Sequence, residues 1–593
     1  MSRNERWNSI DEIKLGFCET TDPKRGAGPV VYVENGRKYS DDSESHIAVI
    51  GRTGKGKSQC CSLPFMREVL RKGESLIMLD PKGEGFQKNA CYIPENYQVF
   101  CVDFRNLRKS PSRWNPLAYP YRLYCSADPD DNDIASSMLS EFWSSIYPCD
   151  VHSERFWTDA AANYAKGLTY GLFDTADKEN INLDSIAVMM EQSETDCERN
   201  QSTVLQKFYR YLSPGSLARR NLATYVTAPK ETRSSIHSVA ASGMEVFSRS
   251  RGLMEMLSDD TLNFMDIDVD CPFVLMIITP DETDVYDALS GLLVSQFSQH
   301  LIRVAQERGG RLPIRVNIIL EELGSVGKGI PSLPKLMVAG RSRNIRLMLV
   351  LQSNTQLVDI YGKSKAETIN SCFGITFGFS TNSWETLTEW SQRCGERLNE
   401  NGGHIIREPL ITAAHLAAMP TGTALVMVDG RYKFIAHLPF YDEMYDNSEW
   451  KAPEYQPSAV KNPLKPFDFE TTVADIEKKH CEDSMDLDSL ALKIEAKISQ
   501  FEAAEAVRQN RKAEKKNHVF ITGIPNDRAK IARIIAVSTG EGFRHAKQRL
   551  MNLPTKVSFS SMSMAMRFAR KISKEGGTAE VVSDEVFSDV SGS

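Results

Sequence analysis

Short runs of consecutive apolar residues, separated by longer amphipathic stretches, mark the first hundred residues of the chain and return after residue 270. The first run covers 47–50, and similar runs follow at 75–80 and 97–104. Apolar runs of this length between helical stretches are typical of strands that are buried on both faces of a mostly parallel sheet. The pattern therefore predicts an α/β domain with helices on both faces of its sheet.

The rhythm changes between residues 127 and 243, where strand-like runs are scarce and helical periodicity extends over long segments. Within 153–173, apolar residues recur at every fourth position, which places them on one face of a helix. The residues on that face are Phe156, Ala160, Tyr164, Leu168 and Leu172. We predict an all-helical insertion in the α/β domain. The alternative is a set of extra crossover helices packed on the sheet.

Strand-like runs reappear at 273–279, and a long helix is expected over 285–306. Further strands are expected within the segments 315–322, 346–352, 372–379 and 423–430. Near the N-terminus, the sequence VVYVENGRKY predicts a hairpin that turns at Asn35-Gly36, because this dipeptide favours a tight turn between strands. Prolines and acidic residues after 446, followed by a charged helix-like run at 490–516, indicate a linker.

Composition places the chain among ordinary globular proteins, with 41% hydrophobic and 25% charged residues. The net charge of −7 excludes a wholesale nucleic-acid coat, so any such contact must be local. The 12 cysteines have no metal-type spacing and predict reduced thiols. The start resembles no signal peptide, and no apolar run is long enough to span a membrane, so we expect a cytoplasmic protein.

The segment GRTGKGKS, at 51–58, follows an apolar strand and precedes a helix, and it fills every fixed position of the phosphate-loop pattern. Its three glycines, Gly51, Gly54 and Gly56, are expected to adopt positive φ and to bring backbone N–H groups close to a polyphosphate. Lys57 can reach the β- and γ-phosphates, and the Ser58 hydroxyl can ligate Mg²⁺. We therefore expect ATP and Mg²⁺ as cofactors. The expected contact residues are Gly51, Thr53, Gly54, Lys55, Gly56, Lys57, Ser58 and Gln59.

A phosphate loop needs a carboxylate at the end of a nearby strand for the Mg²⁺ water shell, and a second acid to polarise the attacking water. Asp80, at the end of SLIMLD, competes for this role with the pair Glu321-Glu322, at the end of NIILEE. Adjacent acids in a strand point to opposite sides and so supply both functions. We favour Glu321 for Mg²⁺ and Glu322 as the general base, with Asp80 in support.

Two further sets of polar residues are candidates for the same site. Gln352 follows an apolar strand, where an amide can orient water near the γ-phosphate. Arg341, Arg343 and Arg346 flank the end of the preceding helix, and one of them is a candidate arginine finger across a subunit boundary. The sequence does not choose among the three.

The order of these motifs resembles that of the coupling-protein ATPases of conjugation and type IV secretion, the TraG/TraD-type group, over roughly residues 40–440. The matching segments are GRTGKGKS, LDPKGE, WNPL, FWTDAA, PKETRSSI, ILEELGSVG, LVLQSNTQL, YG at 361–362, the stretch 369–378 and ALVMVDG. The resemblance implies a homo-hexameric RecA-like motor with an all-helical domain inserted between its two nucleotide motifs. It also implies recruitment of relaxase-bound single-stranded DNA or effector proteins, and delivery to a secretion channel by ATP hydrolysis.

The chain departs from this group in two ways. Members usually have Asp-Glu where this chain has Glu321-Glu322, so hydrolysis here is expected to be slower. Members also usually carry N-terminal transmembrane helices. This chain would then dock peripherally at the inner face of the membrane through a membrane-embedded partner, or belong to a soluble branch.

The C-terminal segment resembles the C-terminal domain of the bacterial ribosomal stalk protein, with an expected order of strand, two helices, strand, helix and strand. The matching positions are Lys530, Gly540, Gly542, Ala546 and Lys547. The stalk domain docks other proteins, so the resemblance implies a recruitment module. Residues 518–580 hold 11 Lys or Arg and 4 Asp or Glu, which favours an acidic protein partner or, second, nucleic acid.

The expected fold is a RecA-like P-loop domain with a helical insertion and a small α+β C-terminal domain. The expected parts are 1–126 and 244–445 for the ATPase domain, 127–243 for the insertion, 446–516 for the linker and 517–583 for the C-terminal domain. A coupling ATPase is the leading hypothesis. A cytosolic DNA-translocating ATPase and a nucleotide-gated substrate receptor with little turnover remain the alternatives.

Overall fold

The described residues divide into two compact units, each built from two separate parts of the chain. In the computed structural model, unit 1 comprises Met1–Trp114 and Asp260–Lys461, and unit 2 comprises Asn115–Asp259 and Asn462–Ser593. The predicted helix-like run at 490–516 lies outside the described residues. The structure describes residues 6–126, 128–148, 155–197, 202–280, 284–325, 329–401, 404–453, 464–465, 467–484, 517–525 and 528–583.

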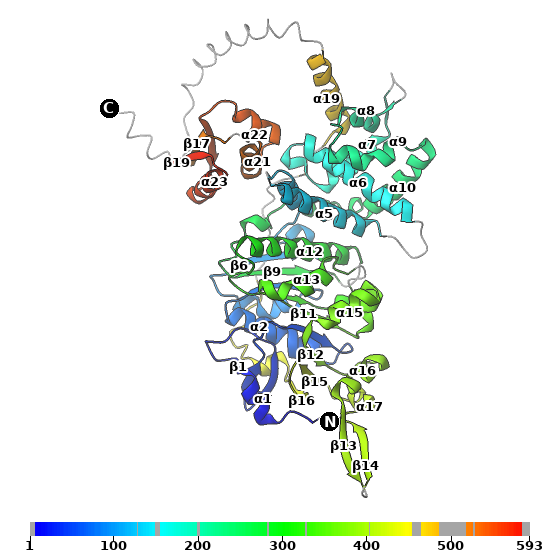
Figure 1. Ribbon diagram of the computed structural model, residues 1–593, viewed down its shortest axis with the longest axis vertical. Coiled ribbons are helices and arrows are strands. Elements are labelled where there is room, and N and C mark those ends of the chain that lie inside the picture. Colours follow the sequence, from blue (N-terminus) through cyan, green and yellow to red (C-terminus); the bar gives the residue numbers. More distant parts are fainter. Residues whose placement is uncertain are drawn as a thin grey trace, which may run out of the picture. The chain divides into compact units, whose positions relative to one another are not determined.

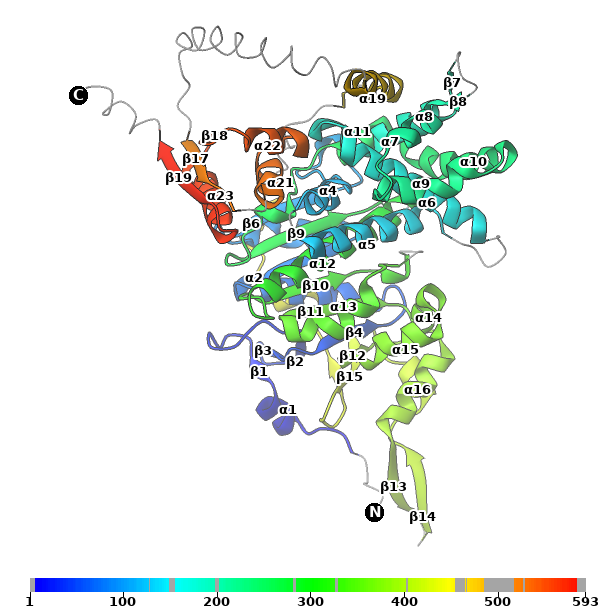
Figure 2. The same cartoon turned by 45° about the horizontal axis from the view of Figure 1, so that its top comes forward.

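Unit 1 is organised around a large mixed sheet. Among the described residues this sheet has nine strands, in the order β16-β15-β12-β4-β11-β10-β5-β9-β6 (Figure 2). The strands from β12 to β6 are parallel, and β15 and β16 join one edge in antiparallel orientation. The prediction of a mostly parallel α/β sheet is therefore confirmed. The strand bounds are β4 (His46–Ile50), β5 (Ser75–Asp80), β6 (Gln98–Asp103), β9 (Phe273–Ile278), β10 (Val316–Leu320), β11 (Ile345–Leu351), β12 (Phe373–Gly378), β15 (Thr423–Val428) and β16 (Phe434–His437).

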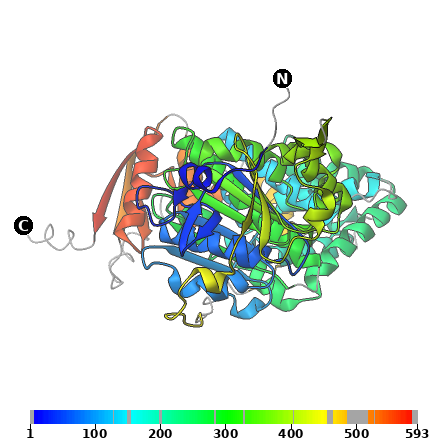
Figure 3. The same cartoon turned by 90° about the horizontal axis from the view of Figure 1, so that it is seen from below.

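The two parts of the chain that form unit 1 contribute neighbouring strands to this sheet. The blue segment before residue 115 and the green to yellow segment after residue 260 interleave in it (Figure 3). Alternate residues of each strand face opposite sides. On one side, Phe65 and Met66 of α2 (Leu63–Arg71) pack in one core with Val49, Met78 and Met348. Figure 1 shows α12 (Asp284–Glu307) and α13 (Leu333–Gly340) over the other side.

Smaller elements complete unit 1. The predicted hairpin is formed by β2 (Val30–Glu34) and β3 (Arg37–Ser40), and its turn residues Asn35 and Gly36 both have positive φ. A second hairpin, β13 (Glu396–Asn401) and β14 (His404–Pro409), projects from the unit and was not predicted (Figure 1). Further elements are β1 (Cys18–Glu19), α1 (Ile10–Gly16), α3 (Glu84–Asn89), α14 (Thr355–Tyr361), α15 (Lys363–Ser371), α16 (Trp384–Cys394), α17 (Ala413–Ala417) and α18 (Tyr441–Met444).

The first part of unit 2 is helical and is centred on α6 (Arg155–Thr175), which packs against α5, α9 and α10. Four of the five apolar residues predicted to share a face of α6 are buried, whereas Phe156 is 50% exposed and contacts the Trp157 ring edge-to-face. Helices also occur outside the predicted 127–243 range at both ends. The elements of this part are α4 (Ala118–Tyr124), α5 (Pro129–Ile146), α7 (Leu183–Ser193), β7 (Asp196–Cys197), β8 (Ser202–Thr203), α8 (Val204–Tyr211), α9 (Leu217–Thr227), α10 (Lys230–Ser248) and α11 (Arg251–Ser258). Helix α19 (Phe469–Ser484), from the second part of unit 2, packs against α7 and α8.

The C-terminal domain has its own hydrophobic core between an antiparallel sheet, in the order β18-β17-β19, and three helices among the described residues. The element order along the chain is the predicted one: strand, two helices, strand, helix, strand. The bounds are β17 (Asn517–Gly523), α21 (Arg528–Thr539), α22 (Phe543–Arg549), β18 (Thr555–Phe559), α23 (Met562–Lys574) and β19 (Thr578–Ser583). Within the described parts of the whole chain, no helix combines the length and apolar character needed to cross a bilayer.

Candidate active site

The phosphate-loop sequence leaves β4 at the carboxyl edge of the large sheet. A Cβ added to Gly51 would lie 2.5 Å from the Phe379 Cβ, so only glycine fits there. Gly54 and Gly56 have φ of +79° and +93°, a region that other residues rarely adopt. Two of the three glycines therefore have positive φ as expected. That expectation is wrong for Gly51, which is required for close packing instead.

Lys57 lies across the loop that contains it. Its Nζ donates a hydrogen bond of 2.6 Å to the Gly51 carbonyl oxygen. Burial lowers the pKa of Lys57, although the nearby carboxylates of Glu321 and Glu322 oppose this shift. Ser58 then begins a π-helical turn, Ser58–Ser62, that leads directly into α2. The loop thus ends at a helix start, where unpaired N–H groups favour an anion.

Thr53, Lys55 and Gln59 are the other residues of the loop that were predicted to contact a ligand through their side chains or backbone. The Thr53 side chain is exposed at the tip of the loop. Lys55 turns away, and its Nζ donates to the Met419 carbonyl oxygen at 2.9 Å, so Lys55 would offer a ligand its backbone only. Gln59 Nε2 lies 3.5 Å from Glu84 Oε2 at the start of α3.

Glu321 meets the phosphate loop, although 263 positions separate it from Ser58 in the sequence. Ser58 Oγ donates to Glu321 Oε2 at 3.0 Å. Strands β10 and β4 both flank β11 in the sheet, so their carboxyl ends lie close together. Glu321 is 5% exposed, and burial, assisted by the charges of Asp80 and Glu322, raises its pKa to about 7 against the effect of the neighbouring hydroxyls.

The second glutamate reaches its position by a turn. Strand β10 ends at Leu320, and Glu322 has a φ of +49°, which is uncommon for a residue other than glycine. The expectation that strand geometry separates the two acids is therefore wrong, because the turn after β10 separates them. Glu322 Oε1 lies 3.0 Å from Lys82 Nζ, in the loop that follows β5.

Asp80, the competing acid, is fixed by its own loop. Its Oδ2 accepts a hydrogen bond of 3.2 Å from the Phe86 N–H, at the start of α3. Burial raises the pKa of Asp80 to about 6, and the backbone N–H groups of Phe86 and Gly85 oppose the shift. Asp80 lines the same pocket as Glu321 and also anchors the start of α3.

Gln352 lies just beyond β11, between the phosphate-loop strand and the strand of the glutamates. Its backbone N–H donates to Gln356 Oε1 at 2.7 Å, and its carbonyl oxygen accepts from Thr381 Oγ1 at 2.8 Å. The side chain itself is exposed. The backbone is therefore held in place while the amide remains accessible.

The three candidate arginine fingers differ sharply in burial. Arg346 is 1% exposed and lies in β11, where it donates to Asn317 Oδ1 at 2.8 Å and lies 3.7 Å from Glu74. It is therefore excluded as a finger, because a buried side chain cannot reach a neighbouring subunit. Arg341 and Arg343 follow α13, and Arg343 donates to the Ala339 carbonyl oxygen at 2.9 Å.

Sequence reasoning missed three residues of this region. Lys82 pairs with Glu322, and Glu84 lines the pocket beside Ser58. Both belong to the LDPKGE motif, so the signal was present but no role was assigned. Phe440 packs on the phosphate loop, with its Cε1 3.1 Å from the position of a Cβ on Gly56. No local pattern marks Phe440, because the contact joins distant parts of the chain.

The acidic residues fit a magnesium-bound nucleotide. Glu321 Oε2 accepts from Ser58, while the buried Oε1 has no hydrogen-bond partner among the described residues. A buried carboxylate oxygen without a partner is costly unless something else satisfies it, such as a metal-bound water. Ser58 and Glu321 are therefore the residues that could hold Mg²⁺, with the phosphate loop beside them.

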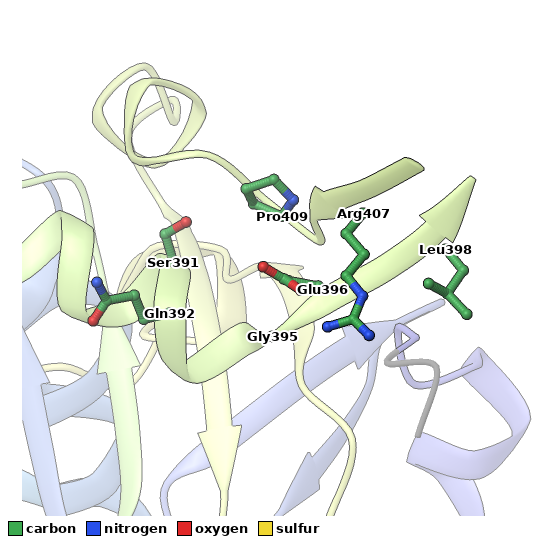
Figure 4. A pocket seen from close by; sticks show the side chains of 7 residues that line it. All are labelled: Ser391, Gln392, Gly395, Glu396, Leu398, Arg407 and Pro409. Atoms are coloured by element: carbon green, nitrogen blue, oxygen red, sulfur yellow. The ribbon is translucent and has the colours of Figure 1, made fainter. Parts of the chain in front are cut away.

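A separate hollow lies at the base of the β13–β14 hairpin, beside α16. Figure 4 shows Glu396 and Arg407 extending from the hairpin strands, with Ser391 on the helix. Its lining also includes Gln392, Gly395, Leu398 and Pro409. None of the phosphate-loop residues or the paired glutamates takes part, so it is not the nucleotide site.

Comparison with known proteins assigns the chain to one family. The family model described as "Type IV secretory system Conjugative DNA transfer" matches residues 5–401. No curated protein sequence matches the chain.

Solved structures of a plasmid coupling protein, TrwB, have a similar fold. The complex of TrwB with a non-hydrolysable GTP analogue matches with a TM-score of 0.53 and 18% identity, over 74% of this chain and 94% of that chain. The complex with a non-hydrolysable ATP analogue gives the same values. The complex with ADP and Mg²⁺ matches with a TM-score of 0.51 and 18% identity, over 77% of this chain and 96% of that chain.

Proposed function

Because the chain belongs to the type IV secretory family of conjugative DNA transfer proteins, we propose that it is a coupling-protein ATPase. In this proposal it recruits a relaxase-bound DNA strand, effector proteins or both, and drives their transfer to a type IV secretion channel by ATP hydrolysis. It acts as a homo-hexamer and docks peripherally at the membrane through a membrane-embedded partner of the channel.

One observation carries the proposal: Ser58 of the phosphate loop donates a hydrogen bond to the buried Glu321 at the end of β10. Lys57 lies beside them, and Glu322 follows in the next position. A phosphate-binding loop joined to a buried carboxylate at the end of a nearby strand is the arrangement that phosphoryl transfer by P-loop enzymes requires. The relatives of similar fold support the choice of nucleotide, since TrwB was solved with ATP and GTP analogues and with ADP and Mg²⁺.

Each residue then has a distinct role. MgATP, when bound, would supply the phosphoanhydride bond whose hydrolysis drives transfer. Lys57 would neutralise phosphate charge, and Ser58 Oγ, together with Glu321 through a water molecule, would hold the metal. Glu322 accepts a proton from the attacking water at a carboxylate oxygen, and the Gln352 amide orients that water.

The C-terminal domain is proposed to dock another protein. It has its own core, and its segment 518–580 carries 11 Lys or Arg against 4 Asp or Glu in a chain whose net charge is −7. This excess of positive charge favours an acidic partner. The domain would thereby recruit transfer substrates.

A nucleotide-gated receptor with little turnover is the second candidate. It is favoured by Glu321, which stands where family members usually have the shorter Asp and which is buried with a pKa raised to about 7. A carboxyl group that is protonated part of the time would hold a metal ion weakly and slow hydrolysis.

The test is an ATPase assay with and without single-stranded DNA, on the wild-type chain and on Lys57→Ala. We expect DNA-stimulated turnover that is lost in the variant. ATP-analogue binding without turnover in the wild type would favour the receptor. Failure of the wild type to bind the analogue at all would reject a nucleotide-driven function.

A further inference from the structure

Lys82 lies in the loop between β5 and α3, directly opposite Glu322. The distance from Lys82 Nζ to Glu322 Oε1 is 3.0 Å. Glu322 adopts a φ of +49°, a conformation that a glutamate takes only when its surroundings favour it. The two residues are 240 positions apart in sequence, so the fold itself brings this ion pair together.

The same lysine lines the pocket of the candidate active site. That pocket is bounded by Ser58 from the phosphate loop, by Asp80 at the end of β5, by Lys82 in the loop after β5, and by both glutamates after β10. An ammonium group in this position is close to any triphosphate held by the loop. Lys82 therefore has two anionic partners available, the Glu322 carboxylate and a bound phosphate.

We propose that Lys82 binds the terminal phosphate of ATP and is held by Glu322 until ATP arrives. On binding, the lysine leaves the Glu322 carboxylate for the phosphate, which frees Glu322 to act as the base. This inference rests on the proposed nucleotide-binding function. It makes Lys82 the residue that distinguishes ATP from ADP.

The strengths of the two contacts favour this exchange. The Lys82 and Glu322 side chains are 45% and 32% exposed, and ion pairs with such exposure are weak because water screens them. A terminal phosphate carries more charge and more acceptor oxygens than a carboxylate, so it competes well for the ammonium. ADP lacks that phosphate and would leave the pair with Glu322 intact.

The experiment measures binding of a fluorescent non-hydrolysable ATP analogue and of fluorescent ADP, with Mg²⁺, to the full chain. We expect Lys82→Met to weaken analogue binding at least about tenfold, the size expected for one charge-assisted contact, with ADP affinity unchanged. Lys82→Arg keeps the positive charge and should bind the ATP analogue almost as tightly as the wild type. The control is Lys88→Met, which removes the same charge from α3, where Lys88 pairs with Asp442 at 2.6 Å outside the pocket.

A double-mutant cycle tests the exchange itself. Glu322→Gln removes the competing carboxylate, so we expect it to tighten analogue binding about two- to fivefold, in line with a partly exposed ion pair. In the Lys82→Met background the same substitution should change the affinity less. Equal effects in both backgrounds would show that Glu322 does not hold Lys82.

The outcomes separate this inference from the proposed function. Lack of analogue binding by the wild type rejects the nucleotide site as a whole. If the wild type binds the analogue normally but Lys82→Met weakens binding of the ATP analogue and of ADP equally, or weakens neither, the proposed role of Lys82 is wrong. The nucleotide site itself would still stand.

A second, independent feature is the outer face of α23 in the C-terminal domain. Met562 and Met566 are 37% and 49% exposed on this helix, and Arg570 and Lys574 continue the same row at intervals of four residues. The opposite face supplies the buried residues Ala565, Phe568, Ala569 and Ile572. The helix thus presents flexible apolar side chains followed by cations.

We infer that this row binds an acidic protein segment that also carries apolar side chains, such as an amphipathic helix. The cations complement acidic residues, and exposed methionines adapt to varied apolar partners. Nucleic acid would bind the cations, but contacts with the methionines would not contribute to its binding. This inference rests on the proposed docking role of the domain.

The test uses the full chain and two fluorescent probes, a synthetic amphipathic peptide of Glu and Leu and an oligo-dT of equal charge. Met562→Ser/Met566→Ser should weaken peptide binding about tenfold and leave oligo-dT unaffected, whereas Arg570→Gln/Lys574→Gln should weaken peptide binding as well. The control is Met551→Ser, an exposed methionine outside the helix.

Several results would contradict the assignment. Peptide binding that is unchanged by the methionine pair, or reduced equally by Met551→Ser, would show that the row is not the binding surface. Binding of oligo-dT but not peptide by the wild type would assign the cations to nucleic acid. Failure of the wild type to bind either probe would contradict the docking role itself.

Discussion

The histidine at the start of the phosphate-loop strand gives the sharpest stability prediction. His46 is 1% exposed, and its Nε2 donates to the Met337 carbonyl oxygen at 2.8 Å. Its Nδ1 accepts from the Leu347 N–H at 3.0 Å, so both ring nitrogens are used by the neutral form. Burial, with the charges of Arg346 and Arg341, lowers the pKa of His46 to about 4.

The size of the effect follows from this shift. The folded pKa is about 4 and the ordinary value is 6.5, so the unfolded chain binds the proton more readily. The stabilisation is therefore fully present above pH 6.5 and is lost as the pH falls towards 4. Between pH 7 and 5 the loss is about 2 kcal/mol. His300 in α12 is also buried, and burial lowers its pKa to about 3, so it contributes a loss of similar size to unit 1 over the same pH range.

The assay is hydrogen exchange of the β4 and β11 amides, converted to opening free energies with correction for intrinsic exchange rates. Between pH 7 and 5 the wild type should lose about 2 kcal/mol more opening free energy than His46→Gln, because the other titrating groups contribute equally to both proteins. His415→Gln, a change in an exposed histidine, should follow the wild type. An identical pH slope in the wild type and His46→Gln would refute the reasoning.

Three further predictions concern the site and its sheet. Glu322→Gln should retain ATP binding and stop hydrolysis, and unchanged turnover in the ATPase assay would show that another group is the base. Gly51→Ala should destabilise unit 1 by about 1–3 kcal/mol, because its Cβ would overlap that of Phe379. A thermal melt measures this, and an unchanged midpoint would contradict it. Arg346→Met should cost about 1–3 kcal/mol in urea unfolding, because it leaves the buried Asn317 Oδ1 without its donor while Arg315 still lies 3.7 Å from Glu74, and a near-neutral result would show that the arginine is dispensable.

Much of the fold could be predicted because its signals are local. The strand before Gly51 and the turn at Asn35-Gly36 follow from short apolar runs and glycine positions, and both are found in the structure. The family resemblance, drawn from the order of several motifs, is confirmed by the match over 5–401. The resemblance of the C-terminal domain to the ribosomal stalk remains a prediction, although its expected element order is observed.

Two of the missed features depend on tertiary contacts that no local pattern contains. The positive φ of Glu322 arises in a turn after β10, so strand alternation could not place its side chain. Arg346 was one of three candidate arginine fingers, but it is buried because Asn317 and Glu74 offer it partners inside the sheet. The β13–β14 hairpin was overlooked although the sequence contains a Gly-Gly turn signal at 402–403, between the two strands.

The most direct test of the central claim is where a metal ion binds together with the nucleotide. Crystals grown with Mn²⁺ and a non-hydrolysable ATP analogue would give an anomalous map that locates the metal independently of the protein. We predict a peak at coordination distance from Ser58 Oγ and one water molecule away from the Glu321 carboxylate, with the analogue's phosphates on the Lys57 loop. A bound analogue whose metal peak lies away from Glu321 would contradict the account.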